Sequence, residues 1–304
     1  MVAALDVGGT SIKAALIDRR GRVVNQRREP TGVERGPAAV VSGIVELAAE
    51  LALTPGAHVR AVGIAVPGTV DPLAGIARLA VNLGWRDVPL VALVSGRTGL
   101  PVTLGHDVRT AVLAEAREGA GKGELSMLFI AIGTGIAGGL ARNGVVDDGA
   151  SGLSGEIGHL VVRPDGPQCR CGNRGCLETV ASASRIADRY AALTHRRRVP
   201  AEQIAQMVRG GDAGAQQVWS EAVDALADAL AAATVLIDPS RFVLGGGLSL
   251  AGETLVDPLT AALAVRLTFR PPPPILLSVL GDRAGVVGAA VMAWDQLAAV
   301  GVDS

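Results

Sequence analysis

Two stretches of this chain share one pattern: ALDVGGTSIKAALIDRRGRVV at residues 4–24 and FIAIGTGIAGGLARNGVV at residues 129–146. In each, an apolar strand meets a glycine–threonine turn, a second strand follows, and a polar turn leads to a third strand. The two copies lie about 125 residues apart, too far for a solenoid repeat. The repetition therefore predicts two α/β domains that each begin with a β-meander and face each other across a ligand-binding cleft.

The composition excludes several classes of partner. The net charge is −1 and aromatic residues make up 2% of the chain, so neither an electrostatic field nor stacking platforms favour nucleic acid or an anionic membrane. The most apolar stretch, LFIAIGTGIAGGL, is too short and too rich in glycine to span a bilayer. The start of the chain lacks the basic and apolar regions of a secretory signal. Three clustered cysteines are a poor disulfide framework, so we expect a cytoplasmic protein.

The repeated glycine turns, residues 8–10 and 133–135, are suited to binding phosphate. Glycines let backbone N–H groups point at an anion, and a threonine hydroxyl adds a donor. For either turn alone a plain hairpin is the favoured interpretation, but the pair suggests that a nucleotide is held from two sides. Asp6 precedes the first turn, whereas Ala131 takes its place before the second. A carboxylate beside just one of the two turns is suited to a Mg²⁺ ion that is held through water.

Residues 133–138 also match the dinucleotide fingerprint GxGxxG. That fingerprint requires a helix to begin inside it, and the residues that follow, GLARNGVV, predict a strand and a turn. We therefore expect no nicotinamide site. The glycines at 245–247 form a third turn at the end of a strand, where ligands bind in α/β sheets.

All three cysteines lie within eight positions, next to a histidine, in the pattern H-x9-C-x-C-x4-C. Three thiolates and one imidazole form the usual ligand set of a structural zinc site. The alternative is unligated cysteines beside a chance histidine. A zinc ion here would hold the loop between Glu156 and Glu178, so that both carboxylates keep fixed positions for a ligand rich in hydroxyl groups. The predicted metal ligands are His159, Cys169, Cys171 and Cys176.

Asp107 lies where a predicted strand ends and a helix begins. Aspartate is a favoured helix N-cap, so capping and catalysis are both open here, and they do not exclude each other. A base of this kind would orient a hydroxyl group and take its proton late in phosphoryl transfer. His106 next to it is either a second polar contact or a loop residue.

With these residues together, the chain resembles the ROK family of sugar kinases and repressors, most of all its bacterial glucokinase branch. The resemblance covers nearly the whole chain, and the glutamate–histidine and zinc motifs are its most specific parts. The matching stretches are LDVGGTSIK, GIAVPGTVD, NLGW, HDVRTAVLAE, IGTGIAGGL, GASGLSGEIGH, CRCGNRGCLE and VLGGGLS.

The resemblance implies an α/β, actin-like (ribonuclease H-like) two-domain kinase fold. We expect a small domain at residues 1–107, a large one at 108–287, and a closing helix at about 288–304 that packs on the small domain. It implies that Asp107 is the general base and that zinc is structural. The implied sugar contacts are Asn82, His106, Asp107, Glu156, His159 and Glu178. The implied ATP and Mg²⁺ contacts are Asp6, Gly8, Gly9, Thr10, Lys13, Gly133, Thr134, Gly135, Gly245, Gly246 and Gly247.

The family commonly has asparagine where this chain has His106, and VRTA after Asp107 also departs from its pattern. The leading expectation is an ATP-dependent hexokinase that forms glucose 6-phosphate. The alternatives are a kinase for N-acetylmannosamine, N-acetylglucosamine or fructose, and a sugar-sensing repressor. A repressor would have a basic recognition helix ahead of its first strand, and this chain shows none. The resemblance also implies a homodimer or homotetramer, and the composition leads us to expect neither nucleic-acid nor membrane partners.

Overall fold

The computed structural model describes residues 1–301, and the last part of the predicted closing helix, residues 302–304, lies outside the described residues. The chain divides into two compact units. The first comprises Met1–Ala114 and the segment from Asp282 onward, and the second comprises Glu115–Gly281. The sequence placed the boundaries near 107 and 287. Helix α3 (Asp107–Glu118) begins in the first unit and ends in the second, so no loop marks that boundary.

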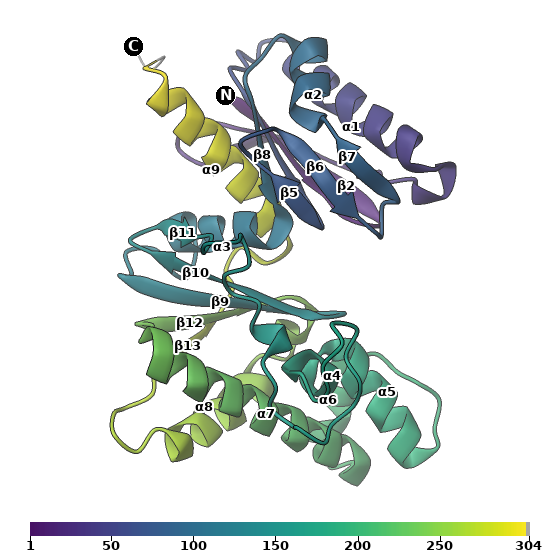
Figure 1. The fold of residues 1–304 in the computed structure, drawn as a ribbon, viewed down its shortest axis with the longest axis vertical. Coiled ribbons are helices and arrows are strands. Elements are labelled where there is room, and N and C mark those ends of the chain that lie inside the picture. The colour runs from purple at the N-terminus through teal and green to yellow at the C-terminus, as the bar shows by residue number, and fades with distance from the viewer. Residues whose placement is uncertain (302–304) are drawn as a thin grey trace. The chain divides into compact units, whose positions relative to one another are not determined.

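The first unit, drawn in purple and blue with α9 (Ala284–Ala299) in yellow in Figure 1, is built on a five-stranded mixed sheet in the order β3-β2-β1-β4-β8. Its strands are β1 (Val2–Val7), β2 (Ser11–Ile17), β3 (Val23–Pro30), β4 (Val62–Val66) and β8 (Val102–His106). The first three strands form an antiparallel meander, whereas β1, β4 and β8 run parallel. The carboxyl ends of these parallel strands therefore meet at one edge of the sheet, where ligands bind in α/β proteins.

Both faces of this sheet are covered by helices. Strand β1 is apolar at nearly every position because its alternate side chains enter two different cores. Leu5 and Val7 pack with α1 (Pro37–Ala52) and α2 (Leu90–Thr98), whereas Val2 and Ala4 pack with α9 (Ala284–Ala299). A small antiparallel sheet completes the unit: β5 (Thr69–Asp71), β6 (Ile76–Ala80) and β7 (Trp85–Val88).

The second unit repeats the arrangement, with strand order β11-β10-β9-β12-β13. Its strands are β9 (Ser126–Ile132), β10 (Ile136–Arg142), β11 (Val145–Asp147), β12 (Arg241–Gly245) and β13 (Ile275–Leu277). Its helices are α4 (Leu177–Ala181), α5 (Ala183–Thr194), α6 (Ala201–Arg209), α7 (Ala213–Ile237) and α8 (Glu253–Arg266). The apolar side chains of these helices and of β9, β10 and β12 form one continuous core.

The internal repeat predicted from residues 4–24 and 129–146 is present, because each unit begins with a three-stranded antiparallel meander. The GxGxxG match opens no helix: β10 begins at Ile136, within the match, and runs to Arg142. The sequence analysis did not predict α2, α8 or the β5–β7 sheet. The described helices include none that is long and apolar enough to cross a membrane.

Candidate functional site

The first glycine turn joins β1 to β2 and brings Asn82 beside it. The Gly8 N–H donates to the carbonyl of Ser11 across the turn at 2.9 Å. A Cβ atom placed on Gly9 would lie 3.2 Å from Nδ2 of Asn82, so a side chain there would crowd this amide and push it slightly away. Asn82 lies between β6 and β7 and is exposed. Two predicted contacts, one for phosphate and one for sugar, thus lie next to each other.

Asp6, at the end of β1, lies in an electrostatic cluster with Lys13 of β2. Lys13 Nζ is 3.4 Å from Oδ2 of Asp6 and donates to the carbonyl of Asp282 at 2.6 Å. Burial raises the pKa of Asp6, Lys13 lowers it, and the charge of Asp107 raises it again. The carboxylates of Asp6 in β1 and Asp107 at the start of α3 therefore interact electrostatically within the first unit. Gly285, at the start of α9, lies against Asp6, and a Cβ atom there would strike the carboxylate.

Asp107 is the first residue of α3, directly after β8. Its Oδ1 accepts the N–H of Val108 at 2.7 Å and lies 3.3 Å from Nε2 of His106. The side chain of an N-cap aspartate ordinarily accepts the N–H of a residue two or three positions further along the helix. Asp107 accepts the N–H of the next residue instead, so its geometry is not that of an N-cap. Burial raises the pKa of Asp107 to about 6, while 33% of its side chain stays exposed. A carboxylate that is both accessible and unusually basic can accept a proton from a bound hydroxyl group.

The second glycine turn joins β9 to β10 in the other unit. The Gly133 N–H donates to the carbonyl of Gly135 at 2.9 Å. Ser184 Oγ donates to the carbonyl of Thr134 at 2.5 Å. Glu178, predicted as a sugar contact, accepts the N–H of Ile136 at 3.0 Å, so this carboxylate also supports the turn.

The second and third glycine turns line one pocket of about 360 Å³ within this unit. Gly133 and Thr134 contribute one side and Gly247 contributes another. Gly246 has φ 79°, and a Cβ atom there would strike the carbonyl of Ile132, so the third turn packs directly against the end of β9. The sequence analysis did not identify three further polar residues in this pocket: Ser184, Arg198 and Glu202.

The predicted zinc ligands come together in one cluster. The possible ligand atoms of His159, Cys169, Cys171 and Cys176 all lie within 4.8 Å of one another. His159 Nδ1 is 3.7 Å from Cys169 Sγ, and the sulfur atoms of Cys171 and Cys176 are 3.6 Å apart. Tight backbone turns permit this approach: Gly175 has φ 66°, and the Cys169 N–H donates to the carbonyl of Asn173 at 2.8 Å.

The chemistry of this donor set fits Zn²⁺. Three sulfurs and one ring nitrogen are the donors of a closed tetrahedral site. Burial raises the pKa of the Cys176 thiol to about 12. A cation in direct contact reverses that effect, because it stabilises the thiolate.

Two acidic residues flank the cluster. Glu156 immediately precedes the short helix Ile157–His159, and its Oε2 lies 4.0 Å from Nε2 of His159. Glu178 follows Cys176 by two residues, in the first turn of α4. Nδ1 of His159 therefore faces the sulfur of Cys169, and Nε2 faces the carboxylate of Glu156. Glu156 and His159 also line a pocket of about 420 Å³ whose other walls are mostly apolar side chains of α7 and of the segment 153–160.

Among the predicted site residues, the structure thus forms two groups, one in each unit. The first contains Asp6, the first glycine turn, Lys13, Asn82, His106 and Asp107. The second contains the other two glycine turns, Glu156, Glu178 and the cluster of His159 with the three cysteines.

Comparison with known proteins decides the family. The sequence model of the ROK family matches residues 2–296. A glucokinase from Thermotoga maritima is 34% identical, over 96% of this chain and 97% of its own length. The chain belongs to the ROK family. Another ROK relative, an N-acetylmannosamine kinase from Shigella boydii, is 33% identical over 96% of this chain and 98% of its own length.

Solved ROK structures share the fold. A ROK family glucokinase from Streptomyces griseus, crystallised in complex with glucose and AMPPNP, superposes with a TM-score of 0.81. It is 32% identical, and the match covers 97% of this chain and 99% of that chain. The expected α/β, actin-like two-domain fold is confirmed, as is the resemblance to the glucokinase branch. This ROK protein is a sugar kinase.

Proposed function

We propose that this ROK kinase transfers the γ-phosphoryl group of Mg-ATP to a hexose, with glucose as the acceptor and glucose 6-phosphate as the product. One observation carries the proposal: the Asp107 carboxyl group at the start of α3 is 33% exposed and has its pKa raised to about 6. The identity to a glucokinase, 34% over nearly the full length of both chains, supports glucose as the acceptor.

Asp107 acts as the general base. With a pKa of about 6 it is ionised at pH 7, yet it accepts a proton more readily than an ordinary carboxylate. As the bond from the sugar O6 to the γ-phosphorus forms, the bond from that phosphorus to the ADP oxygen breaks. The hydroxyl proton passes to a carboxylate oxygen of Asp107.

The remaining residues bind and orient the two substrates. Hydroxyl groups of the sugar are held by Asn82, His106, Glu156, His159 and Glu178. The three glycine turns bind the nucleotide, with the pocket of about 360 Å³ beside Gly133, Thr134 and Gly247 as the adenosine side. Lys13 lies near the first turn, where its charge favours phosphate.

Two metal ions belong to the proposal. Mg²⁺ neutralises charge on the phosphates when bound. The Asp6 carboxylate offers the oxygen donor that this ion prefers, and would hold it through water. Zn²⁺ would be held by His159, Cys169, Cys171 and Cys176 as a structural ion that keeps Glu156 and Glu178 in place.

An N-acetylhexosamine is the second candidate acceptor, because an N-acetylmannosamine kinase is 33% identical over nearly the full length of both chains. N-acetylglucosamine and fructose are further candidate acceptors. A homo-oligomeric state, a cytoplasmic location and the absence of nucleic-acid or membrane partners remain predictions.

A coupled ADP-release assay tests the acceptor. Glucose, mannose, fructose, N-acetylglucosamine and N-acetylmannosamine are each offered with Mg-ATP, and glucose is expected to give the highest kcat/KM. A higher value for N-acetylmannosamine would replace glucose with the second candidate. The absence of turnover with all five sugars would contradict the proposed kinase function.

The base role of Asp107 is tested by Asp107→Asn. We expect kcat to fall at least about a thousandfold, while the dissociation constant for the sugar changes by less than about threefold, because the carboxamide keeps the shape but cannot take the proton. Asp87→Asn is the matched control: Asp87 is in the same unit, 57% exposed, and pairs with Arg78 at the surface. Turnover by Asp107→Asn at the control rate would remove Asp107 from the base role.

A further inference from the structure

Thr31 follows the last residue of β3 and makes two hydrogen bonds to backbone carbonyls of the first glycine turn. Its Oγ1 donates to the carbonyl of Gly8 at 2.6 Å, and its N–H donates to the carbonyl of Thr10 at 3.0 Å. Thr31 is 1% exposed, so water has little access to the donor side of both hydrogen bonds. Thr31 thus holds both ends of the segment Gly8–Thr10.

These two bonds determine which way the turn presents its donors. The described chain contains no cis peptide bond, and in a trans peptide the C=O of one residue and the N–H of the next point in opposite directions. Because the Gly8 carbonyl points at the Thr31 hydroxyl, the Gly9 N–H points away from it. Among residues 1–301, the N–H groups of Gly9 and Thr10 have no backbone acceptor. They are therefore free to bind an anion.

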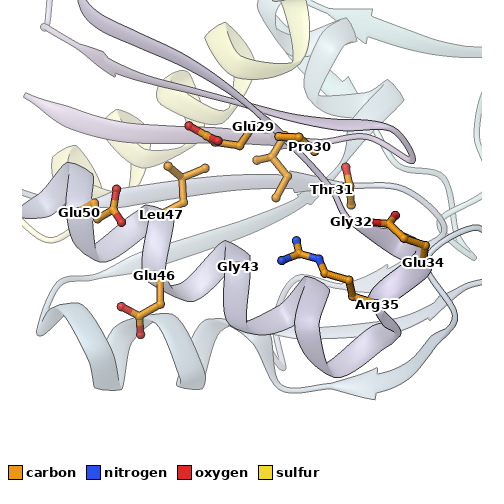
Figure 2. Close-up of a pocket in the computed structure, with 11 residues that line it drawn as sticks. Glu29, Pro30, Thr31, Gly32, Glu34, Arg35, Gly43, Glu46, Leu47 and Glu50 are labelled. Atoms are coloured by element: carbon orange, nitrogen blue, oxygen red, sulfur yellow. The ribbon is translucent and has the colours of Figure 1, made fainter.

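A phosphate group approaching from the side of Thr31 is disfavoured. Thr31, Pro30 and Gly32 lie along the edge of a surface pocket of about 570 Å³, shown in Figure 2. The charged lining of that pocket is four glutamates and one arginine: Glu29, Glu34, Glu46, Glu50 and Arg35. Glu46 and Glu50 pair with Arg97 and Arg27, and the lining keeps a small acidic excess that disfavours a polyanion. The phosphates are therefore expected on the other side of the turn, where the Gly9 N–H points.

We infer that Thr31 is a positioning residue for nucleotide binding, which orients the Gly8–Gly9 peptide so that its N–H meets a phosphate oxygen. The inference rests on the proposed function for the identity of the nucleotide. Thr31 itself does not touch the nucleotide. Its hydroxyl group acts through the Gly8 carbonyl, so removing that hydroxyl weakens nucleotide binding while the sugar contacts stay intact.

Thr31→Val tests the inference, because valine keeps the branched shape and removes only the hydroxyl group. We expect the KM and the dissociation constant for Mg-ATP to rise about tenfold, with the KM for the sugar changed less than about twofold. Thr31→Ser, which restores the hydroxyl group, is expected to stay within about twofold of the wild type for both substrates. If Thr31→Val does not fold, Thr31→Ala carries the same expectation without placing a methyl group against the carbonyl.

Thr234→Val is the matched control. Thr234 is 2% exposed and its Oγ1 donates to a backbone carbonyl, that of Leu230 at 2.8 Å, but it lies within α7 of the second unit. Nucleotide affinity in this variant should equal that of the wild type. Equal affinity in Thr31→Val and Thr234→Val would overturn the inference, as would an equal loss in Thr31→Ser and Thr31→Val. Failure of the proposed function would show as absent turnover in the wild type, whereas this inference is judged from nucleotide dissociation constants of the variants, measured by calorimetry.

Discussion

At the scale of single residues, the first unit places two carboxylates where one would expect their charges to repel. Asp6 lies near the end of β1 and Asp107 at the start of α3, burial raises the pKa of both, and the charge of Asp107 adds to the rise at Asp6. Groups with such raised pKa values concentrate at functional sites. The sequence identified Asp6 from its place before the first glycine turn and Asp107 from its place between a strand and a helix, but the burial that changes their pKa values comes from the tertiary structure, such as the approach of Gly285 of α9 to Asp6.

The raised pKa of Asp107 predicts an acidic limb in the pH–rate profile. The base works only when ionised, so kcat/KM for the sugar should fall as pH drops through about 6 and lose about tenfold per unit below it. An unperturbed carboxyl group would instead keep its activity down to about pH 4. Initial rates between pH 4.5 and 8, with saturating Mg-ATP and limiting sugar, measure this limb. A profile flat down to pH 5 would contradict it.

At the scale of elements, the segment from Glu156 to Glu178 carries the cysteine cluster. Between the short helix Ile157–His159 and α4 it has no longer helix or strand, and isolated β-bridges join Val161 to Cys176 and Gln168 to Arg174, so we expect the cluster to contribute to its shape. Its turns bring His159 and three cysteines together, and the same segment delivers Glu178 to the second glycine turn. Loss of the cluster should therefore disturb both the sugar contacts and that turn.

Metal analysis should find about one zinc ion per chain. Cys176→Ser should lose that ion, lower the melting temperature and raise the KM for the sugar, because Glu156 and Glu178 lose their common support. A chelator applied to the wild type should have the same effects, and added zinc should reverse them. Ser184→Ala, outside the cluster, is the control and should retain full zinc. Wild-type protein that is metal-free yet melts and turns over like the zinc-loaded form would exclude a structural zinc.

At the scale of the whole molecule, a buried acid ties together the two chain segments that enter and leave the second unit. Glu115 is 0% exposed and lies at the first residue of that unit. It accepts the N–H of Ala120 at 2.8 Å and, near the last residues of the unit, the hydroxyl of Ser278 and the N–H of Leu280 at 3.1 Å. Gly119 leaves room for this carboxylate, which a side chain there would strike.

Glu115→Ala should therefore be strongly destabilising. It leaves three partly buried donors without an acceptor and empties a fully buried site, and we expect the free energy of unfolding to fall by about 3 kcal/mol. Glu118→Ala, on the same helix, removes only an exposed ion pair with Lys122 and should cost less than about 0.5 kcal/mol. Urea unfolding followed by circular dichroism measures both variants. Equal midpoints for the two would show that Glu115 does not hold these segments.

The sequence by itself determined the repeated meander, the glycine turns at strand ends and the set of metal donors. These are local features, because strand periodicity, glycine's backbone freedom and cysteine spacing act over a few residues. Only the tertiary structure decided that Asn82 lies beside Gly9, that Glu178 supports the second turn, that Gly247 shares a pocket with Thr134, and that Thr31 holds the first turn. Those contacts join residues far apart in the chain, and they form only when packing of the cores sets the position of each strand and helix.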